Sequence, residues 1–171
     1  VSGATTLNAG TGNITLLNVD GAGDAVNDFN TIDINPGQAV GSTGAVALSD
    51  RNALTVSSVV VGTNQALNLS AGTLTMPAGD IDTGTAALTL GGLATTAGNL
   101  SGGAVTLTGS SGLQLAHNVT ADSLTLTYAG DIAQTAGSLL VATTTQATSS
   151  AGSVDLSAAT NDFGGLVSAA A

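Results

Sequence analysis

Apolar residues return at a nearly constant spacing along the middle of the chain, between Gln65 and Val141. They fall into three interleaved columns with steps of 17 to 21 residues: Leu67, Leu88, Val105 and Leu124; Leu74, Leu93, Leu113 and Ile132; Ile81, Leu100, Val119 and Leu139. A fixed period near 20 residues indicates a solenoid. Three columns sharing one period predict a winding chain with three short strands in each coil of about 19–20 residues.

Within each expected strand, apolar residues alternate with small polar ones, as in residues 105–108 (VTLT) and 124–127 (LTLT). Side chains alternate faces along a strand, so Leu and Val would point into a lumen while Thr, Ser and Asn face water. The expected fold class is therefore all-β, a parallel β-helix (β-solenoid). Strands stack about 4.8 Å apart, so about eight coils would form a rod roughly 35–40 Å long.

The same grid extends towards the amino terminus, over Val40 to Val61. Each of three apolar residues there lies 20 to 22 positions before a column member: Val46 before Leu67, Leu54 before Leu74, and Val59 before Ile81. This coil is slightly longer than those that follow.

A second, longer period relates the two ends of the chain. Gly152–Leu156 (GSVDL) echoes Gly12–Leu16 (GNITL), and Asn161-Asp162-Phe163 echoes Asn27-Asp28-Phe29, with six more residues in the loop of the first copy. Thr143–Thr145 likewise echoes Thr5-Thr6. We interpret residues 1–171 as a single solenoid segment, made of one super-repeat (about 1–140) and the start of the next (about 141–171). A longer parent chain with further copies is expected.

Composition narrows the function classes. Charged residues make up 7% of the chain, and the net charge of −10 comes from eleven Asp against the single base Arg51. This balance argues against binding nucleic acid or anionic membranes, which require a basic surface. No apolar run approaches the ~20 residues of a membrane helix, so no membrane insertion is expected. The absence of Cys excludes disulfides and thiolate sites, and suits a protein that is exported unfolded and folds outside the cell.

Few side chains are candidates for chemistry. The lone His117 precedes Asn118 at an expected corner, and Arg51 has Asp50 as its nearest acid in sequence; we interpret His117 as a polar turn residue and expect no catalytic site. Asp20, Asp24 and Asp28 lie in a glycine-rich loop that is either solvated or a calcium site. We assign no catalytic, cofactor or metal residue. Four glycosylation sequons, at Asn13, Asn68, Asn99 and Asn118, are close to the number that chance gives in this composition.

Paired threonines mark the remaining candidate surface. Thr106, Thr108, Thr125 and Thr127 should form two stacked rows on one face, an arrangement found in ice-binding solenoids. The neighbouring coils interrupt these rows with Asn68/Ser70 and Thr89/Gly91. Thr is also an ordinary outward residue of a strand, which favours a structural role.

Several of these motifs resemble the repeats of filamentous-haemagglutinin-type exoproteins, which are secreted by two-partner or autotransporter routes. The resemblance rests on Gly12–Leu16 followed by Asn27–Phe29, on the second copy from Gly152 to Phe163, and on Tyr128–Leu139, which contains a Gly-x-Ile-x-Gln segment. It covers most of the chain. It implies a right-handed parallel β-helix, an extracellular bacterial location and an adhesive or fibre-forming role.

These observations favour a non-enzymatic structural segment of a secreted or cell-surface fibre, adhesin stalk or matrix filament. The expected partner is the protein itself, by end-to-end or tandem stacking, with a polysaccharide or cell-surface receptor as a further partner. The alternative is a module that binds glycans or another copy of itself through the exposed Thr/Asn face. Ice binding and activity on polysaccharides rank below both.

Overall fold

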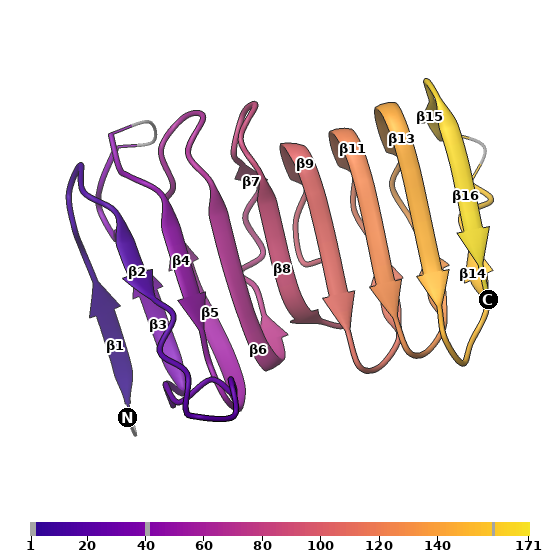
Figure 1. Ribbon diagram of the computed structural model, residues 1–171. Helices are drawn as coiled ribbons and strands as arrows, with labels where there is room; N and C mark the ends of the chain where they lie inside the picture. Colours follow the sequence, from indigo (N-terminus) through magenta and orange to yellow (C-terminus); the bar gives the residue numbers. More distant parts are fainter. Residues whose placement is uncertain (1–2, 40–41, 159) are drawn as a thin grey trace.

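The computed structural model describes residues 3–39, 42–158 and 160–171. In these residues the chain winds into a β-solenoid of about 7 turns, whose strands all pair in parallel, and it contains no helix (Figure 1). The predicted all-β parallel solenoid is confirmed. Val40, where one coil was expected to begin, lies outside the described residues.

Three walls surround the lumen, and the first is the longest. It consists of eight stacked strand segments: β2 (Ile14–Leu16), β4 (Val46–Ser49), the start of β6 (Leu67–Thr75), β8 (Leu88–Leu93), the second halves of β9 (Leu100–Gly109), β11 (Val119–Tyr128) and β13 (Leu139–Ser149), and β16 (Leu166–Ala170). The predicted column from Leu67 to Leu124 lies in this wall, each member paired with the next. The column also extends to Ile14 at one end and Val167 at the other.

The second wall is interrupted. Its amino-terminal part contains β1 (Ala4–Leu7), β3 (Thr31–Ile34), β5 (Ala53–Val59) and the end of β6; its carboxy-terminal part contains β10 (Leu113–Leu115), β12 (Ile132–Gln134) and β14 (Val154–Asp155). Leu74 pairs with Leu93, and Leu113 with Ile132, as the sequence predicts. Between the two parts the described residues form only one bridge, from Thr95 to Gln114.

The third wall is short in each turn. It contains β7 (Ile81–Asp82), the first halves of β9, β11 and β13, and β15 (Asp162–Phe163). The predicted column Ile81, Leu100, Val119 and Leu139 lies here in register. In β9, β11 and β13 the third wall runs on into the first, so two of the three predicted strands of a coil join into one bent strand of 10 or 11 residues.

The ladder around Val59 is irregular. Val59 pairs with Ile34 of the preceding turn, in the second wall. The pairing between β3 and β5 shifts register after Ile32, and this extra residue lengthens β5 to seven residues. Among the described residues no ladder pair joins Val59 to Ile81, so their expected equivalence stays a prediction.

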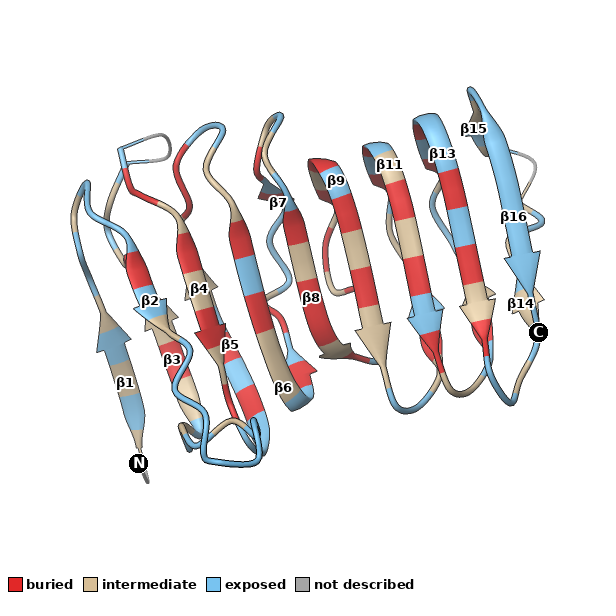
Figure 2. Ribbon diagram, in the orientation of Figure 1, coloured by how far each residue is buried: buried red, intermediate tan, exposed pale blue. Residues whose placement is uncertain are grey.

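Aliphatic side chains fill the lumen. Along β8, β9 and β11 buried positions alternate with partly exposed ones, which Figure 2 shows as bands across the strands. Leu67, Leu88 and Leu107 are fully buried. Burying one such side chain contributes roughly 1.5–3 kcal/mol. Towards the carboxyl end the inward row of the first wall becomes smaller, with Thr145 and Ala147 following Leu124 and Leu126.

Candidate functional site

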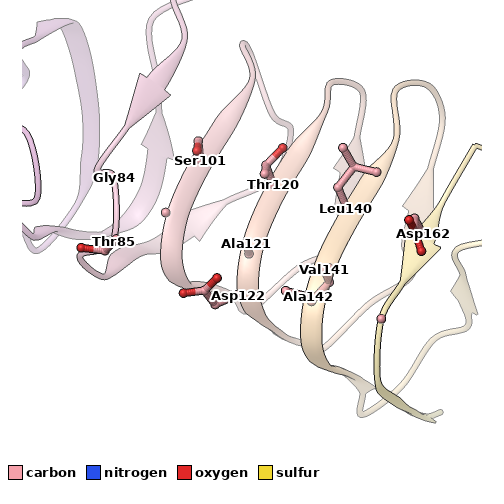
Figure 3. Close-up of a pocket in the computed structure, with 12 residues that line it drawn as sticks. Gly84, Thr85, Ser101, Thr120, Ala121, Asp122, Leu140, Val141, Ala142 and Asp162 are labelled. Carbon is pink, nitrogen blue, oxygen red and sulfur yellow. The ribbon is translucent and has the colours of Figure 1, made fainter.

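A groove of about 380 Å³ crosses several turns at the bend between the third and first walls (Figure 3). The outward row Ser101, Thr120, Leu140 and Asp162 forms one side of it, with each residue paired to the next across the strands. Asp122 lies at the bend of β11. The groove therefore runs along the rod axis.

The chemistry of this groove is limited to hydroxyls, carboxylates and apolar surface. Asp122 and Asp162 supply its charges, and its lining contains neither a histidine nor a basic residue. Leu140 is 43% exposed and presents an apolar patch. Such a lining suits contacts with a neutral, hydroxyl-rich or cationic ligand.

The acidic loop lies apart from this groove. Asp20 Oδ1 accepts hydrogen bonds from the backbone N–H groups of Ala22 at 2.8 Å and Asp24 at 3.1 Å, and these bonds lower the pKa of the Asp20 carboxyl. Asp28 Oδ1 accepts a bond from Asn52 instead. Among the described residues, no three acidic or histidine side chains are grouped closely enough to hold a metal ion. Asp20 serves as the internal cap of its own loop.

Arg51, the single base, contacts the same loop. Its Nε donates to the carbonyl of Ala25 at 3.3 Å, and Arg51 lines a surface pocket together with Asp20, Asp24 and Asp50. Asp50 is buried, and its carboxylate accepts the backbone N–H groups of Phe29 at 2.6 Å and Asn52 at 3.0 Å. The Asp50–Arg51 pair therefore anchors the long loop to the rod.

His117 lies at a corner, where the sequence predicts it. Its Nδ1 is 2.9 Å from the carbonyl oxygen of Thr96 in the preceding turn. Since a carbonyl only accepts hydrogen bonds, this contact requires the proton on Nδ1. Thr96 is buried, and its hydroxyl in turn accepts the backbone N–H of Ala116. His117 is therefore part of the hydrogen bonding between two adjacent turns.

A row of side-chain oxygens at the entry to the third wall was not recognised from the sequence. Asp80 Oδ1 accepts the backbone N–H of Asn99 at 3.1 Å, Asn99 Oδ1 accepts that of Asn118 at 3.1 Å, and Asn118 Oδ1 accepts that of Ser138 at 2.9 Å. Each turn thereby caps the next. The sequence contains a sign of this row, because Asp80, Asn99 and Asn118 recur every 19 residues. Both asparagines belong to sequons.

The other two sequons lie in different surroundings. Asn13 Oδ1 accepts the backbone N–H of Ala45 at 2.9 Å, so its side chain also caps a neighbouring turn. Asn68 is exposed on the outer side of the first wall, between Ala47 and Thr89 in the ladder.

Tyr128, the only tyrosine, links turns that are not adjacent. Tyr128 is 2% exposed, and its hydroxyl donates to the carbonyl of Leu93 at 2.8 Å, 35 residues away. The pairing of Tyr128 with Gly109 leaves room for the ring, because a Cβ at Gly109 would lie 2.5 Å from it. Burial raises the pKa of the Tyr128 hydroxyl. The bond supplies Leu93, which ends β8 where the second wall is interrupted, with a donor.

The repeated Asn-Asp-Phe motif has one local geometry in both copies. Asn27 Nδ2 donates to the carbonyl of Leu16 at 2.8 Å, and Asn161 Nδ2 donates to that of Leu156 at 2.9 Å. Each asparagine thus closes its loop onto the leucine of the preceding GxxxL segment. The two copies nevertheless occupy different walls, because Ile14 pairs with Val46 in the first and Val154 with Ile132 in the second. The super-repeat itself stays a prediction.

The predicted threonine rows lie on the outer side of the first wall. Thr106 pairs with Thr125, and Thr108 with Thr127. The structure extends both rows by one residue, since Thr89 pairs with Thr106 and Thr127 with Thr148. Within the eight first-wall segments, from Ile14–Leu16 to Leu166–Ala170, no residue carries a charge. The eleven Asp all lie in the other walls, the corners and the long loop.

Comparison with known proteins gives one match. Residues 102–170 match the model of a family described as repeats of unknown function (DUF5649), which agrees with the tandem turns of the solenoid. No curated protein and no solved structure matches the chain. Among the described residues, no helix is long and apolar enough to cross a membrane.

Proposed function

We propose that this chain is a rigid, non-enzymatic segment of a secreted or cell-surface fibre, an adhesin stalk or matrix filament of the filamentous-haemagglutinin type. The observation that carries the proposal is the first wall, whose eight strand segments pair without a register shift from Ile14 to Val167. At about 4.8 Å per turn, the seven spacings give a rod about 34 Å long. A parallel ladder backed by a filled lumen resists bending and extension.

Growth of the rod beyond this segment is part of the proposal. β16 pairs with β13 on one side, and the five residues of β16 are all exposed. A free strand edge is a template for further pairing. Additional turns of the same chain, or a second molecule stacked end to end, would continue the ladder there. The proposed location of the fibre is extracellular, on a bacterium.

Deletion of one whole turn tests the spacer role. Removing residues 67–87 joins Ala66 to Leu88 and places Leu88 beneath Val46, because Leu67 pairs with both. We expect a folded protein about 4.8 Å shorter by small-angle X-ray scattering. Removing residues 67–76 instead puts the following residues out of phase with the walls, and we expect unfolding. Equal loss of β-structure by circular dichroism in both variants would contradict independent turns.

The cellular part of the proposal needs a separate measurement. Antibodies against the native chain should label intact cells of the source organism without permeabilisation. Labelling that appears only after lysis would contradict a surface role. Turnover of a polysaccharide by the purified chain would contradict a non-enzymatic one.

Glycan recognition is a second candidate function, and the groove is the feature that favours it. Ser101 and Thr120 place hydroxyls along the axis beside the apolar Leu140, so a neutral oligosaccharide lying along the rod would meet one such residue per turn. Calorimetric titration with neutral oligosaccharides tests this. Binding should weaken in Thr120→Ala but not in Thr125→Ala, which changes the first wall of the same strand.

A further inference from the structure

Charge is segregated around this rod. The third wall and its bend carry Asp82, Asp122 and Asp162, and the second wall carries Asp33 and Asp155. The first wall has no charged residue in any of its eight strand segments. In a protein with a net charge of −10, two copies that approach through any other wall bring carboxylates together. The first wall is the surface on which that repulsion is smallest.

The outer side of the first wall is also regular. The row Asn68, Thr89, Thr106 and Thr125 continues from strand to strand, and the shifts in register lie outside this wall, between Ser70 and Leu74 and between Ala121 and Ser123. Its side chains are short, and β-branched threonine loses little rotamer freedom in a contact. Two identical faces have the same spacing, so their rows can interdigitate along the whole rod, as they do in dry sheet-to-sheet interfaces.

We propose that the outer side of the first wall is a lateral self-association surface, through which two copies of this chain pack face to face. The pair is related by a two-fold axis and closes at the dimer. The proposal goes beyond the rod function and differs from end-to-end stacking, which uses the strand edges and stays open. It holds equally for a short rod and for a longer one.

The size of the surface sets the strength of the contact. Seven spacings of about 4.8 Å and a width of about 15 Å give roughly 500 Å² per copy, or about 1,000 Å² in total. Stable complexes bury about 1,200–2,000 Å². The dimer of this segment is therefore weak, with dissociation nearer the millimolar than the nanomolar range, and each added turn enlarges the surface in proportion.

Salt provides a signature of this packing. The other walls remain acidic, so long-range repulsion between copies extends about 30 Å at 0.01 M salt and only about 8 Å at 0.15 M. Association through the uncharged wall should therefore strengthen as salt rises, whereas a contact built on ion pairs would weaken.

Sedimentation of the purified chain tests the proposal. At concentrations approaching 1 mM, we expect a monomer–dimer equilibrium that shifts towards dimer with added NaCl. Thr106→Asp with Thr125→Asp should lower the association constant at least tenfold, since it places two carboxylates at the centre of each face. Ser101→Asp with Thr120→Asp adds the same charge to the third wall of the same strands and should change the constant less than twofold. A monomer under all conditions, or equal weakening by both pairs, would overturn the proposal.

Cross-linking gives a second readout that does not depend on charge. The chain contains no cysteine, so each variant carries a single thiol. Among Thr89→Cys, Thr106→Cys and Thr125→Cys, at least one should form covalent dimers with a short bismaleimide, while Ser101→Cys and Thr120→Cys should not. Covalent dimers of Ser101→Cys or Thr120→Cys, with none from the three first-wall variants, would contradict lateral packing. So would association into oligomers larger than a dimer in which the first-wall cysteines do not cross-link.

Discussion

The first and second walls are built from the same residue types, yet the first is continuous and the second is interrupted. The difference begins at one corner. From the first to the second wall the chain advances by seven positions, from Leu67 to Leu74, but by only five from Leu88 to Leu93. Gly92, with φ at +86°, permits this short corner, where a Cβ would lie 2.2 Å from the carbonyl oxygen of Ala71. A left-handed residue at a tight corner is the usual reason for glycine.

The short corner has consequences one turn later. Beyond Leu93, the bridge from Thr95 to Gln114 is the only β-pairing with the next turn in the second wall among the described residues, and β10, β12 and β14 form a separate three-stranded sheet. Tyr128 then supplies the Leu93 carbonyl with a hydrogen bond. The comparison teaches that a solenoid tolerates a break in one wall when another wall holds the register and a side chain satisfies the freed backbone group.

The largest effect should come from the lumen side of the continuous wall. Leu107 is fully buried and pairs with Leu90 and Leu126 in the stacked row. Leu107→Ala should lower the free energy of unfolding by about 2–5 kcal/mol, because it removes apolar contacts and leaves a cavity. Urea unfolding followed by circular dichroism measures this. Thr108→Ala, on the outer side of the same strand, should stay within about 0.5 kcal/mol. Equal losses would contradict the assignment of the two faces.

A smaller loss is expected at the interrupted wall. Tyr128→Phe keeps the ring but leaves the Leu93 carbonyl without its 2.8 Å donor. An unsatisfied buried carbonyl costs about 1–3 kcal/mol. Urea unfolding should show this loss, while Thr127→Val, the exposed neighbour in β11, should change the stability little. An unchanged unfolding midpoint in Tyr128→Phe would mean that Leu93 finds another partner.

The same hydroxyl makes the protein sensitive to alkali. Burial raises the pKa of Tyr128 above its ordinary value of 10.0, so the folded state retains this proton after the unfolded state has released its own. The contribution of the protonated Tyr128 hydroxyl to the free energy of unfolding is therefore complete below about pH 10 and declines as the pH rises further. Stability measured from pH 8 to pH 12 should therefore fall above pH 10 in the wild type and fall less in Tyr128→Phe. Parallel curves would contradict this assignment.

These effects also show what the sequence could predict. The period of the apolar residues was sufficient for the three walls. The ladders confirm the columns that begin at Leu67 and Ile81, and they confirm the column from Leu74 except at its step from Leu93 to Leu113. The register break was not predicted, although the 17-residue step from Leu88 to Val105 was its visible sign. A spacing reports how many residues a turn uses, and not which corner uses fewer of them.

The groove and the contacts between turns were harder to predict for a different reason. Asp122, Leu140 and Asp162 line one groove because β11, β13 and β15 lie side by side at a bend, where the pairing of β11 with β13 shifts register. No local motif in the sequence marks that bend. The capping by Asp80, Asn99 and Asn118 could have been predicted, because these residues recur every 19 positions. Asparagine is common throughout the chain, however, so this recurrence did not stand out.

Capping at the entry to the third wall should contribute modestly. Asn118 Oδ1 accepts bonds from both the backbone N–H and the hydroxyl of Ser138, at 2.9 and 3.2 Å. Asn118→Ala should lower the free energy of unfolding by about 0.5–1.5 kcal/mol, the net value of a typical hydrogen bond. Asn68→Ala, on the outer side of the first wall, provides the matched control and should have almost no effect. A larger loss at Asn68 would mean that the first wall depends on its outer polar row.

The smallest effect should be a gain in stability at the carboxyl end of the first wall. Thr145 continues the inward row after Leu124 and is 2% exposed, and its hydroxyl has no hydrogen-bond partner among the described residues. Valine has nearly the same shape without the hydroxyl, so Thr145→Val should raise the free energy of unfolding by up to about 1 kcal/mol. Thr144→Val, exposed beside it, is the control and should change little. A loss in Thr145→Val would show that the hydroxyl is satisfied in solution, and that this end of the lumen, unlike its aliphatic middle, admits water.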